Sequence, residues 1–215
     1  MMSLTQAAEH VHMDASELKH FAQRGEIEAE KRGDDWYFEH RTLDEWAQRN
    51  LLTVGKRDLE RVQRADLTLE NLFRADAIDL DLGAKAKAGV IRDMSELAVK
   101  SGLVYDTDGL YAELAAREEA ASTAIGNGVA LLHPRYHDPY FFEESFIAYG
   151  RSSRGVFFGA PDDEPTHHFF LICSTNHEEH LHLLAKLALL ARKSEFLEAL
   201  ASAENFEDIL KACQL

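Results

Sequence analysis

Residues 122–135 read STAIGNGVALLHPR and place a histidine, His133, directly after an apolar run. The run GVALL at 128–132 is short, continuously apolar and preceded by glycines, a pattern typical of a strand covered on both faces. Such a strand normally ends in turn residues. A titratable ring at this position therefore indicates a chemical role, with the imidazole held by the sheet and its tip in solvent.

The surrounding chain alternates between helical and strand patterns. Residues 88–102 and 106–120 carry apolar side chains at helical spacing, and FFLIC at 169–173 repeats the covered-strand pattern. FIAYG at 146–150 and GVFFG at 155–159 predict two further strands. Helices that alternate with apolar strands predict an α/β fold.

Composition limits the classes of function. The chain has 215 residues, of which 46% are hydrophobic, enough for a packed core. Its formal net charge of −15 opposes association with nucleic acid and with membranes. The apolar segment 181–191 contains Lys186 and is too short to span a bilayer, and the N-terminus lacks a secretory signal pattern. Cys173 and Cys213 match no metal or redox spacing, so we expect a cytoplasmic protein without metal or cofactor.

Residues 1–50 carry their own helix-start signals. Three pairs have the spacing of a capping box: Ser3 with Gln6, Asp14 with Glu17, and Thr42 with Glu45. Between the second and third pair, residues 26–40 read EIEAEKRGDDWYFEH and alternate around a Gly33-Asp34 turn, which predicts a hairpin. Two helices, a hairpin and a third helix make a small winged unit.

The order of SLTQAAEHV, Gly-Glu-Ile, WYF and LDEW over residues 3–48 resembles excisionase/MerR-like helix-turn-helix domains. The resemblance implies that the second helix, Ala15–Arg24, enters the DNA major groove. The candidate phosphate contacts are Lys19, Arg24, Lys31 and Arg32. Residues 1–50 nevertheless hold six Lys and Arg against eleven Asp and Glu, a net charge of −5, whereas phosphate neutralisation supplies most DNA affinity. A protein-docking or dimerisation module is an equal alternative.

Residues 51–67 are polar, comparatively rich in basic side chains, and carry only a thin apolar stripe that includes Leu59 and Val62. This pattern predicts a helical linker. Beyond it the apolar runs lengthen and glycines become more frequent, so we place the second domain at 68–215.

Three ordered blocks of the second domain carry a second resemblance. REEAASTAIGNGVALLHPR (117–135), FGAPDDEPTHHFFLICS (158–174) and EHLHLLAKLALLARK (179–193) are similar to enzyme IIA domains of the fructose/mannitol type in the bacterial phosphotransferase system, including its nitrogen-regulatory branch. The similarity runs from about residue 69 to 213. It implies a mixed central sheet flanked by helices, preceded here by the small winged helix-turn-helix domain.

The same resemblance implies a phosphoryl-acceptor site. His133 would accept the group from the phosphocarrier protein HPr or a related carrier, with Arg117 and His180 as the other active-site residues. The group then passes to an enzyme IIB, or its presence is itself the signal in regulatory members. The residue types suit this chemistry, because imidazole is a nucleophile at neutral pH and phosphoryl transfer needs mainly positioning and charge neutralisation. The N-terminal domain favours a regulatory protein.

The sequence departs from the family pattern where Pro134 follows the histidine instead of preceding it, which removes a backbone N–H close to the site. Arg135 is a candidate to replace that donor. Three alternatives stay open: a DNA-binding transcriptional regulator with a degenerate, unphosphorylated enzyme IIA-like sensor, a non-phosphorylated interaction module, and a purely structural His133. A His177–His180 pair has metal-ligand spacing, but we favour an active-site role for His180 over zinc. A homodimer is compatible with the sequence.

Overall fold

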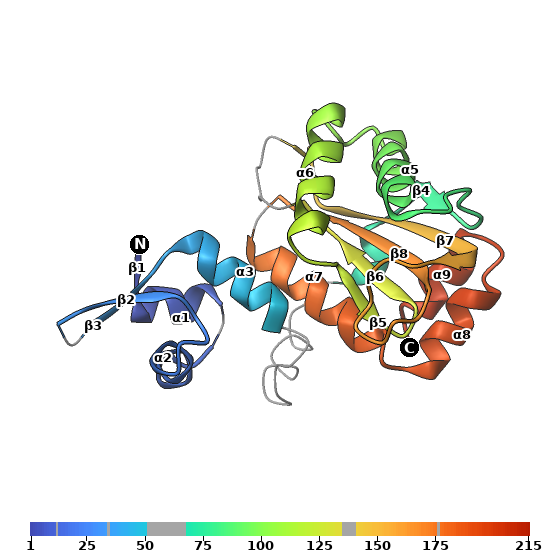
Figure 1. Ribbon diagram of the computed structural model, residues 1–215. Coiled ribbons are helices and arrows are strands. Elements are labelled where there is room, and N and C mark those ends of the chain that lie inside the picture. Colours follow the sequence, from blue (N-terminus) through green and yellow to red (C-terminus); the bar gives the residue numbers. More distant parts are fainter. Residues whose placement is uncertain (12, 34, 51–67, 135–140, 176) are drawn as a thin grey trace. The chain divides into compact units, whose positions relative to one another are not determined.

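The computed structural model describes residues 1–11, 13–33, 35–50, 68–134, 141–175 and 177–215 (Figure 1). The chain forms two compact units, Met1–Ala65 and Asp66–Leu215. The predicted helical linker at 51–67 lies outside the described residues. No helix in the described ranges is both long enough and apolar enough to cross a membrane.

The N-terminal unit combines short helices with a small antiparallel sheet. In chain order its elements are β1 (Met2–Ser3), α1 (Leu4–His10), α2 (Ala15–Gln23), β2 (Ala29–Arg32), β3 (Asp35–Phe38) and α3 (His40–Asn50). The strand order is β1-β3-β2, and the antiparallel pairing of β2 with β3 confirms the predicted hairpin. The assignment of this unit to the winged helix-turn-helix class stays a prediction.

Two of the three helix starts in this unit follow the predicted capping residues. Ser3 and Gln6 form the predicted capping box at α1, and the Asp14 carboxylate accepts the Ser16 N–H at 2.8 Å at the start of α2. The third expected start was wrong. The helix α3 begins at His40 rather than at Thr42, because the chain turns into a helix directly after β3 and the Leu43 N–H already bonds the Glu39 carbonyl at 3.0 Å.

The C-terminal unit contains a five-stranded mixed sheet. Its elements are the short 3-10 helix η1 (Leu69–Asn71), β4 (Phe73–Asp79), α5 (Lys87–Lys100), α6 (Thr107–Ala120), β5 (Ala124–Gly126), β6 (Val129–Leu132), β7 (Phe146–Val156), β8 (Thr166–Cys173), α7 (His177–Leu190), α8 (Ser194–Ser202) and α9 (Phe206–Ala212). The strand order is β4-β7-β8-β6-β5. Two neighbouring pairs, β4 with β7 and β6 with β8, are parallel, and the other two are antiparallel.

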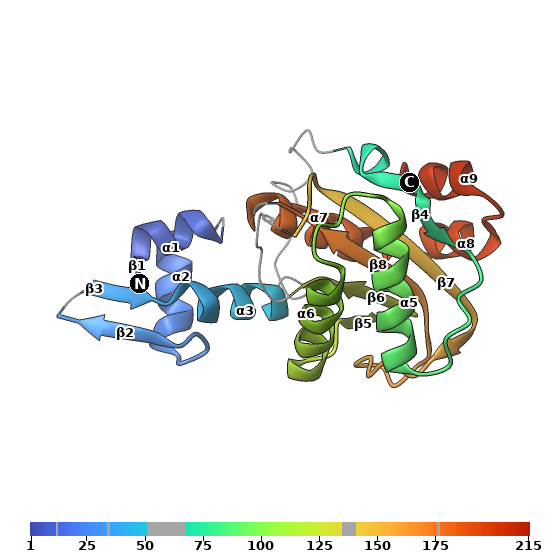
Figure 2. The ribbon, with the colours of Figure 1, turned by 90° about the horizontal axis from the view of Figure 1, so that it is seen from above.

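Helices cover both faces of this sheet (Figures 1 and 2). The helices α5 and α6 lie on one face, and α7, α8 and α9 lie on the other. Every residue of β6 is buried, and so is the C-terminal half of β8, which confirms that GVALL and FFLIC belong to strands covered on both sides. The structure thus confirms the expected α/β architecture with a mixed central sheet.

Some predicted boundaries differ from the structure. GVFFG at 155–159 was expected to be a separate strand, but only its first two residues are in a strand, as the end of β7. One long strand forms because β7 pairs with β8 from Phe146 to Val156, across a register irregularity after Arg151. Beyond Val156 the ladder stops, and Phe157 is 75% exposed.

Candidate active site

His133 directly follows β6, an inner strand between β8 and β5. Its side chain was expected to reach solvent, but the residue is only 3% exposed. The strand before it and Pro134 after it are buried too, and α7 packs over this end of β6. The sheet therefore does hold the ring as expected, whereas the expectation of a solvent-exposed tip was wrong.

The hydrogen bonds of His133 define its tautomer. Its Nδ1 lies 2.9 Å from the carbonyl oxygen of Leu131, which can only accept, so Nδ1 carries the proton. Its Nε2 accepts a hydrogen bond from Nε of Arg117 at 3.0 Å, which requires a lone pair on Nε2. The ring is therefore neutral with Nε2 as its nucleophilic atom, the form that a phosphoryl acceptor needs.

Arg117 reaches His133 from the last turn of α6. A second nitrogen of its guanidinium, Nη1, donates to the carbonyl oxygen of Ala121 at 2.7 Å, just beyond the helix. Two hydrogen bonds in different directions fix the plane of the guanidinium. The cation is thus held beside the nitrogen where a transferred dianion would sit.

His180 comes from the first turn of α7 and is completely buried. Its ring packs edge-on against that of His133, with centroids 5.0 Å apart and an interplanar angle of 65°. Its Nδ1 forms a hydrogen bond of 3.2 Å with the hydroxyl of Ser174, which follows β8. The structure therefore brings the three predicted site residues together from β6, α6 and α7.

The start of α7 is fixed by polar contacts from the end of the neighbouring strands. Ser145 precedes β7, and its hydroxyl bonds the carboxylate of Glu179. The same hydroxyl accepts the N–H of Thr175 at 3.0 Å. These contacts join the β8–α7 connection to β7 and so help to place His180. Sequence patterns gave no reason to single out Ser145 or Ser174.

The remaining histidines of the second domain have other surroundings. His168 is buried, and its Nδ1 forms a 2.8 Å hydrogen bond with the Tyr149 hydroxyl. Burial, with the neighbouring His167 and Arg151, lowers the pKa of His168 to about 4, and burial raises the pKa of the Tyr149 hydroxyl above its usual value. His167 bonds the Ser152 carbonyl. In the parallel pairing of β6 and β8, His168 lies beside Val129, at the opposite end of β6 from His133.

The structure describes only some of the other residues that the sequence indicated as candidates. Arg135, the candidate replacement donor, lies outside the described residues. Among the residues that the structure describes, no three His, Cys, Asp or Glu side chains gather in a way that could hold a metal ion.

The candidate DNA contacts lie on α2 and the hairpin of the N-terminal unit. Arg24, the residue after α2, forms a salt bridge of 2.8 Å with Glu26. Arg32 bonds both carboxylate oxygens of Glu30, at 2.9 and 2.8 Å. These hydrogen bonds lower the pKa of Glu30 and raise the pKa of Arg32. Lys31 and Lys19 complete the set, with the Lys31 ammonium 6.0 Å from the Trp36 ring centroid.

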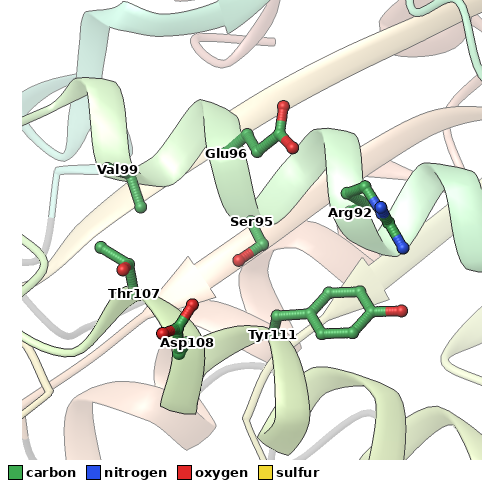
Figure 3. Close-up of a pocket in the computed structure, with 7 residues that line it drawn as sticks. All are labelled: Arg92, Ser95, Glu96, Val99, Thr107, Asp108 and Tyr111. Atoms are coloured by element: carbon green, nitrogen blue, oxygen red, sulfur yellow. The ribbon is translucent and has the colours of Figure 1, made fainter.

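A groove of ≈ 500 Å³ lies between α5 and α6, away from the histidine pair (Figure 3). The Arg92 guanidinium lies over the Tyr111 ring, 5.6 Å from its centroid, at one end of the groove. The buried Ser95 and the Asp108 carboxylate face each other across its middle. No pattern in the sequence indicates this groove.

Residues 71–214 match the family model of the phosphoenolpyruvate-dependent sugar phosphotransferase system, EIIA 2. The chain belongs to this EIIA family. Members of the family carry a phosphohistidine and transfer phosphoryl groups. The resemblance of the second domain to enzyme IIA is thereby confirmed, whereas the resemblance of residues 3–48 to helix-turn-helix domains stays a prediction.

Individual relatives agree with the family match. The EIIA domain is 30% identical to the fructose-specific EIIABC component of Bacillus subtilis, covering 67% of this chain but only 22% of that longer protein. It is 29% identical to the fructose-specific EIIA component of Haloferax volcanii, covering 62% of this chain and 86% of the relative. The crystal structure of the nitrogen regulatory protein IIA-Ntr from Neisseria meningitidis has a TM-score of 0.60 and 25% identity, covering 67% and 97% of the two chains.

Proposed function

We propose that His133 of the EIIA domain accepts a phosphoryl group on Nε2 from the phosphohistidine of an HPr-like carrier. The observation that supports this most directly is the 3.0 Å hydrogen bond from Arg117 Nε to His133 Nε2. It places a fixed cation at the one ring nitrogen that has a lone pair. A histidine with a purely structural role would not need a guanidinium at that atom.

In the proposed transfer, the P–N bond in the carrier breaks as a new bond forms between phosphorus and Nε2 of His133. Arg117 first gives up its hydrogen bond to the lone pair of Nε2 and then binds the incoming phosphoryl oxygens. Its positive charge thus stays beside the phosphoryl group during the transfer. The Nδ1–H of His133 stays on the Leu131 carbonyl and prevents rotation of the ring. His180, packed against His133, supplies a second polar group beside the phosphoryl.

The partners follow from the same chemistry. Family members pair with HPr-type carriers and with enzyme IIB domains. We propose an HPr-like donor for this chain, and either an enzyme IIB or a regulatory target protein as the next partner. A nitrogen regulatory protein among the solved relatives, together with the additional N-terminal unit, supports the regulatory alternative.

The test is incubation of the full chain with labelled phosphoenolpyruvate, enzyme I and HPr. Acid-labile label should appear on wild type and on His167→Gln, because His167 lies near the other end of the strand pair. It should disappear in His133→Ala. Label that persists in His133→Ala at wild-type amounts would overturn the assignment.

A DNA-binding regulator with a degenerate EIIA domain is the second candidate. It is supported by the order of helices and hairpin in residues 1–50, and weakened by the carboxylates that bind Arg24 and Arg32. A gel-shift assay with genomic fragments at low salt tests it. A shift in the absence of any phosphorylation would favour this candidate. If no fragment shifts, the N-terminal unit acts through protein contacts, and sedimentation of the full chain shows whether one of them is a homodimer.

A further inference from the structure

Glu118 follows Arg117 in α6 and is only 4% exposed. One of its carboxylate oxygens accepts the backbone N–H of Thr123 at 2.8 Å and the Thr123 hydroxyl at 2.6 Å. The other accepts Nζ of Lys87, from the first turn of α5, at 2.7 Å. All three bonds are charge-assisted and join the end of α6 to the start of α5 and to the residue before β5.

These bonds belong to a closed circuit that contains the histidine. The carbonyl of Thr123 accepts the N–H of Leu131 at 3.0 Å, and the carbonyl of Leu131 accepts Nδ1–H of His133 at 2.9 Å. From His133 the circuit returns through Nε2 to Arg117, which is covalently joined to Glu118. The His133 ring and the Arg117 guanidinium are therefore held in fixed positions by one closed circuit of hydrogen bonds and the covalent link from residue 117 to 118. The Glu118 carboxylate ties this circuit to Thr123.

We propose that Glu118 is a positioning residue for phosphoryl transfer at His133, an inference that rests on the proposed function of the EIIA domain. Its carboxylate determines where α6 ends relative to β5 and β6, and so where the Arg117 guanidinium meets Nε2. It does not touch the reacting atoms. Its charge is matched by Lys87, whose ammonium also lies 5.0 Å from the Phe158 ring centroid, so the buried anion is not left unpaired.

The requirement is for a carboxylate, not only for its shape. Glutamine in place of Glu118 keeps one oxygen for Thr123, but its amide nitrogen then faces the Lys87 ammonium, donor against donor. The side chain must give up one of its two partners, and the end of α6 loses a constraint. Small displacements of a positioned group slow transfer by about tenfold to a hundredfold.

The experiment compares four variants of the full chain for phosphoryl transfer from phosphorylated HPr. Glu118→Gln should lower the maximal rate by about tenfold or more. Its KM for the carrier should stay within about twofold, because the Glu118 carboxylate bonds Lys87 and Thr123 within the domain. Thr123→Val, which removes one bond to the carboxylate, should slow transfer less, and Thr123→Ser should restore it. The matched control is Glu119→Gln, the same change at the exposed neighbour, which should transfer at the wild-type rate.

A second measurement keeps the inference independent of the transfer assay. In unphosphorylated protein, the ¹⁵N shift of His133 Nε2 reports its hydrogen bond from Arg117, and it should move in Glu118→Gln but not in Glu119→Gln. If wild type takes up no label, the proposed function fails while this shift still tests the circuit. If wild type is labelled and folded Glu118→Gln shows both the wild-type rate and the wild-type shift, the positioning role is overturned.

Discussion

Two regions of the chain hold arginine side chains by contrasting means. In the EIIA domain, Arg117 donates to an imidazole nitrogen and to a peptide carbonyl, both of them neutral acceptors. In the N-terminal unit, Arg24 and Arg32 bind the carboxylates of Glu26 and Glu30, two residues away along the chain. The same functional group is thus aimed at a nucleophile in one region and paired with an anion in the other.

The contrast shows why a count of basic residues is a poor guide to phosphate binding. Because Arg117 donates to Nε2 of His133, its charge already lies beside the atom where an incoming dianion would bind. A guanidinium that is paired with a carboxylate must exchange one anion for another, which reduces the free energy gained on binding phosphate. We therefore expect Arg117 to matter much more for phosphate chemistry than Arg24 or Arg32.

The largest expected effect is that of Arg117→Ala on phosphoryl transfer. Loss of the guanidinium removes the charge beside Nε2, and by analogy with other positioned donors the rate should fall by about a hundredfold to a thousandfold. Arg32→Ala, which removes an arginine already bound to Glu30, should leave the rate unchanged. Single-turnover transfer from phosphorylated HPr measures both. Equal losses in the two variants would break the contrast between the regions.

A smaller effect concerns His168, a buried histidine of the EIIA domain that lies outside the candidate site. Because burial lowers the pKa of His168 to about 4, the folded protein binds its proton less well than the unfolded chain, whose pKa is about 6.5. Stability therefore falls as the pH drops from about 6.5 to about 4, by about 3 kcal/mol in total for this group, and is fully present above that window.

His168→Gln tests this assignment, because glutamine can still bond the Tyr149 hydroxyl but does not titrate in the window. Urea unfolding between pH 4 and 7 should give a shallower pH dependence for the variant than for wild type. His167→Gln is the comparison at the neighbouring position: it removes only a cause of the shift that is smaller than burial, so it should flatten the pH dependence less than His168→Gln does. Parallel curves for wild type and His168→Gln would assign the acid sensitivity to other groups.

Sequence patterns predicted the parts of the EIIA domain that repeat a simple rule. Continuous apolar runs located β6 and β8, and helical spacing located α5 and α6. The elements β4 and β5 were not predicted, although Phe73 and Ala77 of β4 are buried with the exposed Asp76 between them. The strand β5 has three residues, fewer than a periodic pattern needs to be recognised.

The sequence indicated which residues form the site, but not their burial or their contacts. Family resemblance pointed to His133, Arg117 and His180, and the structure brings these side chains together. Burial of the ring could not be read from a strand-end position, since it depends on α7 packing over β6 from a distant part of the chain. Glu118 was overlooked for a related reason, because its partners Lys87 and Thr123 meet it only after the sheet has formed.

The smallest expected effect concerns the N-terminal unit and tests whether the carboxylates keep Arg24 and Arg32 from binding phosphate. Replacing Glu26 and Glu30 by glutamine should release Arg24 and Arg32 and steepen the salt dependence of non-specific DNA binding. If both cations then meet phosphates, the slope of log K against log salt should grow by about 2. The matched control is Glu9→Gln with Glu39→Gln, which changes the net charge equally but leaves both arginine pairs in place. Fluorescence anisotropy with labelled duplex DNA across a salt series measures the slopes. If the two double variants steepen the slopes equally, overall charge controls DNA contact. The ion pairs of Arg24 and Arg32 would then not explain weak DNA binding.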